Sequence, residues 1–169
     1  MKLKKQAGFS LIELLIVVVI IGIIAAIAIP NLLAARRSAN EGSTVSAMRT
    51  LHGAQVTYSA TYGSGQYAGV ASGTADATAL TQLGTPGLVD GTMAGGVKSG
   101  FTFRGGRTAA SSTVPATFFF TAIPTSTAAV VATGTRRFGI STDGVIKADA
   151  TATTHYTDVT IATASALAN

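Results

Sequence analysis

The feature that most constrains this chain is a run of about 22 residues without a charge, from Leu14 to Ala35. As an α-helix it would rise about 33 Å, enough to cross the hydrocarbon core of a bilayer. The charges that flank it are three lysines on one side and two arginines on the other: Lys2, Lys4, Lys5, Arg36 and Arg37. Because a short N-terminal arm usually stays cytoplasmic, the sequence predicts a single-pass segment with the C-terminal part outside the cytoplasm.

An ordinary secretory signal peptide is the alternative reading of the same residues. The lysines form a basic start, and Ala26-Ile27-Ala28 offers a small-x-small cleavage sequence after the apolar stretch. Two details count against it, because a charged Glu13 stands at the head of the run and the run exceeds the usual length of about 7 to 15 residues. If signal peptidase did cut after Ala28, the product would be a secreted soluble binding domain.

The residues around Glu13 resemble a known signal. Gly8-Phe9-Ser10-Leu11-Ile12-Glu13-Leu14-Leu15-Ile16-Val17-Val18, followed by Ile29-Pro30-Asn31, looks like the class III signal of type IV pilins and pseudopilins. The resemblance implies that a prepilin peptidase cleaves between Gly8 and Phe9 and methylates the new N-terminus at Phe9. It also implies a homo-oligomeric helical filament built by a pilus or secretion assembly machinery, with the precursor in the bacterial inner membrane.

Glu13 needs a partner on physical grounds. A carboxylate at the centre of a membrane helix costs roughly 2.5 to 3.5 kcal/mol, and less near the interface. Cleavage at Phe9 would free an α-amino group with a pKa near 8. The resemblance of this segment to the pilin family implies that Glu13 meets a neighbouring subunit's N-terminus during assembly. The alternative is a carboxylate that snorkels to the interface without a partner.

The helical pattern continues past the apolar run. A stripe at steps of three and four extends to Tyr62, and Gly63-Ser64-Gly65 supplies a stop. We therefore expect one helix from about Phe9 to Tyr62, with kinks at Gly22 and Pro30. The residues of the stripe are Met48, Leu51, Gln55, Tyr58 and Tyr62, widened by Val45, His52 and Val56. The polar sequence Asn40-Glu41-Gly42-Ser43 is either a weak point of this helix or an exposed face.

The remainder predicts a small antiparallel sheet. Strands are expected at residues 100–104 and 117–123, where aromatic and β-branched residues gather. Asp143-Gly144 predicts a hairpin between residues 137–141 and 145–148. Tyr156 to Ile161 is expected to be another edge strand. The phenylalanines of the first two strands are expected to pack on the helix stripe instead of forming an electron path or a nucleic-acid platform.

These elements predict an α+β fold, a long helix packed against an antiparallel sheet. The expected divisions are a basic leader (1–8), a transmembrane or filament-core half of the helix (9–35), an amphipathic half (36–62), a connecting loop region (63–99) and the sheet of a globular head (100–169). Many pilins close their C-terminal loop with a disulfide, which this chain cannot make because it has no cysteine. It also lacks a clear counterpart of the calcium loop of major secretion pseudopilins.

The composition provides few side chains that could form a catalytic or metal site. Without cysteine and with only His52 and His155, the chain predicts no catalytic site, no metal site and no cofactor. Positions in turns and at solvated strand edges explain Asp143 and Asp149 better than calcium binding does. The net charge of +5 includes the N-terminal lysines, so no specific nucleic-acid partner is predicted. Four arginines could form a basic patch, although solvated strand edges are the simpler reading: Arg104, Arg107, Arg136 and Arg137.

The sequence hypothesis is therefore a structural subunit and not an enzyme. As a pilin it would leave the membrane to join a cell-surface pilus. As a pseudopilin of a type II secretion system it would form a short periplasmic filament. The adhesion, motility or DNA-uptake role of such a fibre does not follow from one sequence.

Overall fold

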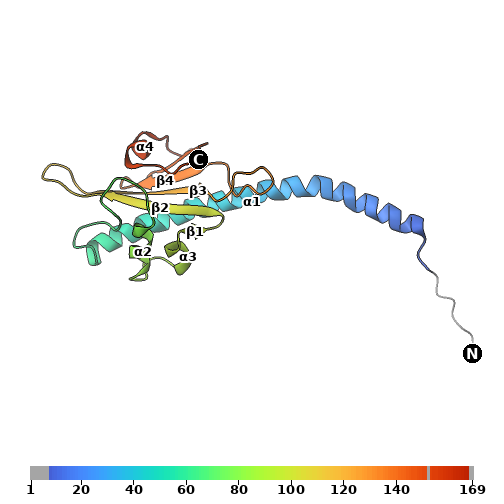
Figure 1. The fold of residues 1–169 in the computed structure, drawn as a ribbon, viewed down its shortest axis with the longest axis horizontal. Coiled ribbons are helices and arrows are strands. Elements are labelled where there is room, and N and C mark those ends of the chain that lie inside the picture. Colours follow the sequence, from blue (N-terminus) through green and yellow to red (C-terminus); the bar gives the residue numbers. More distant parts are fainter. Residues whose placement is uncertain (1–7, 152, 168–169) are drawn as a thin grey trace, which may run out of the picture. The chain divides into compact units, whose positions relative to one another are not determined.

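The computed structural model describes residues 8–151 and 153–167. Apart from Gly8, the expected basic leader lies outside the described residues. The chain divides into two compact units, residues 1–35 and residues 36–169, which we call the N-terminal unit and the head unit. The head unit contains the sheet and every helix that follows α1 (Figure 1).

Helix α1 spans Leu11–Thr61, which confirms the long helix predicted from the sequence. It passes through Pro30 and through the polar stretch at residues 40–43 without a break. The kinks expected at Gly22 and Pro30 stay predictions. Past its end, the Gly63 N–H bonds the Tyr58 carbonyl at 2.8 Å and the Gly65 N–H bonds the Ser59 carbonyl at 2.9 Å. Gly65 has φ +84°, a left-handed conformation that glycine adopts without a steric penalty, so the predicted stop is confirmed.

The head unit contains a five-stranded antiparallel sheet in the order β1-β2-β3-β4-β5. The strands are β1 (Val97–Lys98), β2 (Phe101–Thr108), β3 (Thr117–Pro124), β4 (Arg137–Ser141) and β5 (Ile146–Asp149). The predicted hairpin is confirmed, since β4 pairs with β5 and Gly144 takes φ +72° in the turn. The α+β prediction is therefore correct.

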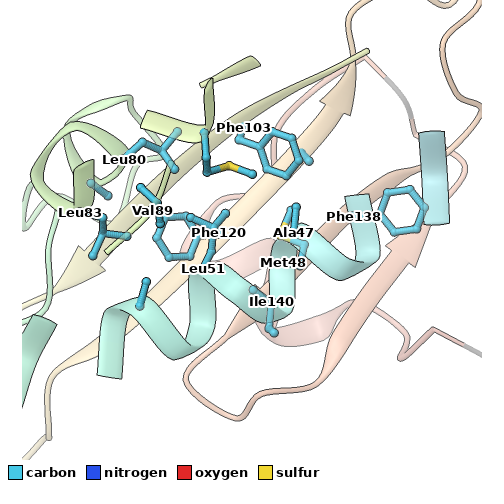
Figure 2. Packing of buried hydrophobic residues seen from close by; sticks show 14 of the residues in the cluster. Ala47, Met48, Leu51, Leu80, Leu83, Val89, Phe103, Phe120, Phe138 and Ile140 are labelled. Carbon is cyan, nitrogen blue, oxygen red and sulfur yellow. The ribbon is translucent and has the colours of Figure 1, made fainter. Parts of the chain in front are cut away.

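The core of the head unit lies between α1 and one face of the sheet. Helix residues Met48 and Leu51 are fully buried against Phe103 and Phe120 of the sheet (Figure 2). This confirms that the aromatic residues of the strands are core residues. Phe119 is also buried but packs on the opposite face of the sheet, because successive side chains of a strand point to opposite faces.

Phe119 belongs to a second cluster with Tyr156 and Ile161. These residues come from the C-terminal segment, where α4 spans Asp158–Thr163. The strand expected at Tyr156–Ile161 is therefore wrong. Thr157 caps the helix instead: its side chain accepts from the Thr160 N–H, and the Thr160 hydroxyl accepts from the Thr157 N–H.

Residues 63–99 also hold more than the expected loop. They contain α2 (Thr78–Gly84), α3 (Gly91–Ala94) and β1. Leu80 and Leu83 of α2 are fully buried in the core, and Asp90 caps α3 by accepting from the Met93 N–H at 2.7 Å. Both helices are too short for hydrophobic periodicity to predict them, because α2 has seven residues and α3 has four.

Candidate functional site

The start of α1 is built around Glu13. The Ser10 N–H donates to Glu13 Oε2 at 3.0 Å, and the Ile12 N–H lies 3.4 Å from the Ser10 hydroxyl oxygen. Ser10 thus caps the helix and Glu13, its third residue, reaches back to the cap. The carboxylate also lies where the partial positive charge of the helix N-terminus favours an anion. Glu13 therefore stabilises the helix start within its own chain.

Gly8 and Phe9 lie immediately before this cap. Both are exposed, and the Phe9 side chain is 89% exposed. Neither residue is part of α1, so their backbone lies outside the helical hydrogen-bond ladder. The bond between Gly8 and Phe9 is sterically accessible, since a Cβ added to Gly8 would meet nothing within 4 Å.

Behind the cap, the N-terminal unit presents an almost wholly apolar surface. Its leucine, isoleucine and valine side chains from Leu11 to Leu32 are more than half exposed. Among the described residues, α1 is the one helix long and apolar enough to cross a membrane. The amide of Asn31 donates to the Ile27 carbonyl at 3.0 Å, which satisfies a polar group inside this stretch. The segment thus places one carboxylate beside a long lipid-compatible surface, and an apolar groove adjoins Glu13 between Phe9 and Val17.

A second carboxylate, Glu41, was missed by sequence reasoning. It is buried within the head unit, where Oε1 accepts from the Thr135 N–H at 2.8 Å and the Thr135 hydroxyl at 2.9 Å. Oε2 accepts from Nε and Nη2 of Arg136 at 3.0 and 2.8 Å. Burial raises the pKa of Glu41, but these donors outweigh it and hold the pKa below its ordinary value.

No sequence signal near Glu41 pointed to this arrangement. Its partners lie more than 90 residues away, and Asn40-Glu41-Gly42-Ser43 reads locally as a solvent-exposed stretch. The bonds join α1 to the connection between β3 and β4. The neighbouring Asn40 amide adds a bond of 2.9 Å to the Thr133 carbonyl.

The carboxylates considered for calcium have other partners. Asp149 accepts from Arg137 at 2.8 Å and from the Tyr156 hydroxyl at 2.8 Å, and Asp143 lies 3.3 Å from Lys147 Nζ. Burial raises the pKa of Asp149, but the Arg137, Thr151 and Tyr156 donors together lower it to about 2. No group of three potential ligands that could hold a metal ion occurs among residues 8–151 and 153–167.

Three of the four arginines considered for a basic patch make contacts within the head unit. Arg136 and Arg137 each pair with a carboxylate, on Glu41 and Asp149 respectively. Arg107 donates to the Gly69 carbonyl and to the Gln66 side chain. Arg104 is exposed on β2. Three of the four therefore have structural partners that hold loops and strands together.

The two histidines are partly buried and lie apart in the head unit. The His52 ring lies 5.4 Å from the Phe118 ring in a tilted arrangement. Burial and the nearby Arg104 charge lower the pKa of His155 to about 4, so this imidazole is neutral at pH 7. Within the described residues, His52 Nε2 and His155 Nδ1 are buried without a hydrogen-bond partner.

Comparison with known proteins finds a match at the N-terminal end of the chain. Residues 3–29 match the family model of the prokaryotic N-terminal methylation motif. The type IV wide pilus major component PilA4 of Thermus thermophilus is 62% identical over 39 residues, which is 23% of this chain and 30% of that protein. The type II secretion system core protein G of Vibrio cholerae is 42% identical over 53 residues, 31% of this chain and 36% of that protein.

A further relative is the type II secretion system core protein G of Klebsiella pneumoniae, 36% identical over 52 residues, 31% of this chain and 37% of that protein. These matches cover only about a third of the length of the relatives. No solved structure matches the chain significantly. The chain therefore contains the N-terminal methylation motif and, over part of its length, is similar to a type IV pilus component and to type II secretion pseudopilins.

Proposed function

We propose that this chain is a structural filament subunit, cleaved between Gly8 and Phe9, N-methylated at Phe9 and assembled through its apolar helix into a type IV pilus. The observation that carries the proposal is the capped helix start, in which an accessible Gly8-Phe9 bond lies next to Glu13 and a long exposed apolar surface. The matched N-terminal methylation motif supports the same processing.

The precursor first lies in the inner membrane, with the head unit outside the cytoplasm and the leader inside. Prepilin peptidase then removes the basic leader, which deletes three lysines and creates a new ammonium group at Phe9. That group is largely protonated at neutral pH. The exposed apolar side chains of α1 leave lipid only if they pack against other apolar helices, which is what a bundle of identical subunits supplies.

Glu13 sets the axial position of each arriving subunit. Its Oε2 accepts the Ser10 N–H, while Oε1 makes no bond to any other described residue. The ammonium at Phe9 of a neighbouring subunit completes the pairing of this carboxylate. A shift by one helical turn separates the two charges by about 5 Å, so other staggers leave a carboxylate unpaired in an apolar bundle.

A pseudopilin of a type II secretion system is the second candidate. The match to core protein G of Vibrio cholerae extends over 53 residues, compared with 39 residues for the pilus component PilA4. Deletion of the gene separates the two roles: loss of surface fibres supports the pilus, and loss of protein secretion with intact fibres supports the pseudopilus.

The secreted soluble domain is the remaining alternative. Cleavage after Ala28 would cut inside α1, which is continuous from Leu11 to Thr61. N-terminal mass analysis of the protein purified from its native cells distinguishes the alternatives. A chain that begins with methylated Phe9 agrees with the proposal, and a chain that begins at Ile29 overturns it.

Substitutions at Glu13 test the register role separately from the helix cap. Glu13→Gln retains a side chain that can complete the cap but removes the charge, whereas Glu13→Ala removes both. We expect both variants to be inserted and cleaved normally, and both to lower filament yield at least tenfold. Normal filaments from Glu13→Gln together with defective filaments from Glu13→Ala would show that Glu13 acts only as a cap.

A further inference from the structure

The connection between β3 and β4 carries an unusual surface. Residues 127–132, which we call the valine loop, read Thr-Ala-Ala-Val-Val-Ala. Residues 128–131 are all exposed, and the side chains of Val130 and Val131 are 71% and 64% exposed. No residue from 124 to 135 is charged. Four consecutive exposed apolar residues are a defect in a soluble surface unless they have a function.

The base of the valine loop is firmly held. The Thr125 N–H donates to the Gly100 carbonyl at 2.9 Å, and the Thr133 N–H donates to the Ser126 carbonyl at 2.9 Å. Past the loop, Thr135 is bound by Glu41. These bonds order both ends of the connection, so its apolar tip is presented in a defined place. Because the loop is already ordered, binding to a partner costs little conformational entropy.

This base lies against α1 close to the beginning of the head unit (Figure 1). The Asn40 amide contacts the Thr133 carbonyl, and Asn40 follows the end of the uncharged run by five residues or about 7.5 Å of helix. In a bilayer, the interfacial region adds about 5 to 8 Å to each side of the hydrocarbon core. If the uncharged run spans the core, Asn40 lies at the depth of the lipid headgroups.

The chemistry around the loop suits the same environment. Glu41, the acidic group that contacts the connection, is neutralised by Arg136. Arg36 is exposed at the start of the head unit and can meet anionic headgroups. The valine loop itself lacks the tyrosine, tryptophan and arginine side chains that dominate protein–protein contacts. Valine is among the residues whose insertion into a bilayer is favourable, so an uncharged loop with two exposed valines suits a lipid surface.

We infer that the valine loop inserts Val130 and Val131 into the outer interface of the lipid bilayer before the membrane-anchored subunit enters a filament. The loop and the apolar segment then hold the head unit at two points. This inference rests on the membrane-anchored precursor of the proposed function. It adds a lipid-contacting surface in the head unit that must be released when the subunit enters a filament.

The chain contains no tryptophan, so a single introduced tryptophan reports its own surroundings. Three full-length variants are reconstituted at low density in vesicles of phosphatidylethanolamine and phosphatidylglycerol with brominated acyl chains. Val131→Trp probes the loop, and Val19→Trp probes the apolar segment. Val114→Trp is the matched control, because Val114 is 53% exposed in the connection at the opposite end of β3.

We expect emission from Trp at positions 19 and 131 to shift to shorter wavelength and to be quenched by bromine, while emission at position 114 stays unshifted and unquenched. Quenching at position 19 but not at 131 overturns the lipid contact and leaves the membrane anchor intact. Absence of quenching at position 19 overturns the anchor and the loop contact together.

A second copy of the chain is the competing occupant. If position 131 becomes shielded only as the ratio of protein to lipid rises, the loop is a subunit contact and the lipid inference is wrong. Thermal unfolding of each variant in detergent checks that the fold is intact, which we expect because all three valines are exposed.

Discussion

Replacement of Glu41 by glutamine tests whether the buried carboxylate fixes the β3–β4 connection to α1. The glutamine is nearly isosteric, so the change removes the negative charge with little change in packing. Its carbonyl oxygen can still accept from the two Thr135 donors at the Oε1 position. Its NH₂ group then faces the Nε and Nη2 donors of Arg136, and both charge-assisted bonds are lost.

The expected cost follows from the burial of the two partners. A hydrogen bond to a charged group contributes roughly 1.5 to 3 kcal/mol. The Glu41 side chain is 10% exposed, so water does not compensate on that side, whereas the Arg136 side chain is 46% exposed and can turn towards solvent. We therefore expect Glu41→Gln to lower the free energy of unfolding of the head unit by about 2 kcal/mol, below the sum of two full bonds.

The control is Lys98→Gln, which breaks the Lys98–Asp90 pair. The side chains of that pair are 35% and 56% exposed, so water screens the interaction and the pair contributes little to stability. Thermal unfolding of full-length protein in detergent, followed by circular dichroism, measures both variants. In a domain of this size, 2 kcal/mol corresponds to a decrease in Tm of about 8 °C. Equal decreases for Glu41→Gln and Lys98→Gln would refute the argument.

The pH dependence provides a second check on Glu41. Because its pKa is lower in the folded state than in the unfolded state, its contribution is fully present above the ordinary pKa of a glutamate. It is lost as the pH falls through the lowered folded value. The difference in Tm between wild type and Glu41→Gln should therefore stay constant from pH 7 to about pH 5 and shrink at lower pH. A difference that persists unchanged to pH 2 contradicts a charge-based role.

Two further variants test the C-terminal part of the head unit by the same unfolding assay. Tyr156→Phe removes the 2.8 Å hydrogen bond to Asp149 and should cost about 1 kcal/mol, and no loss would mean that water replaces that bond fully. Gly139→Ala should destabilise the head unit more, because the added Cβ would lie 2.7 Å from a methyl carbon of Ile161. Gly42→Ala, in open space on α1, should instead stabilise by about 0.5 to 1 kcal/mol. Similar effects of the two substitutions would contradict the packing described.

Local patterns were sufficient to predict the long helix and the hairpin. An uncharged run followed by a three-and-four stripe specifies α1 along its whole length, and the helix ends at Thr61, shortly before Ser64 and Gly65 take a positive φ. Asp143-Gly144 specifies the turn between β4 and β5 within four residues. In each case the residues that determine the structure are neighbours in the sequence.

The errors arise where a few residues decide between two structures. Tyr156 to Ile161 is rich in β-branched residues, which favours a strand, but the reciprocal bonds of Thr157 and Thr160 start a helix instead. That helix turns Ile161 towards Phe119 on the outer face of the sheet. Local propensity is weak here because the cap and the contact with the sheet contribute more than the strand preference of six residues.

The two carboxylates of α1 differ in what their surroundings leave unsatisfied. Glu41 has donors on both oxygens and is buried, so its arrangement is complete within one chain. Glu13 is exposed beside an apolar groove and receives the Ser10 N–H on one oxygen. The sequence distinguished them only by position, since Glu13 interrupts an apolar run and Glu41 lies among polar residues. A residue that is locally stable yet incompletely paired is suited to recognise another chain, because assembly adds a bond without first breaking the helix cap.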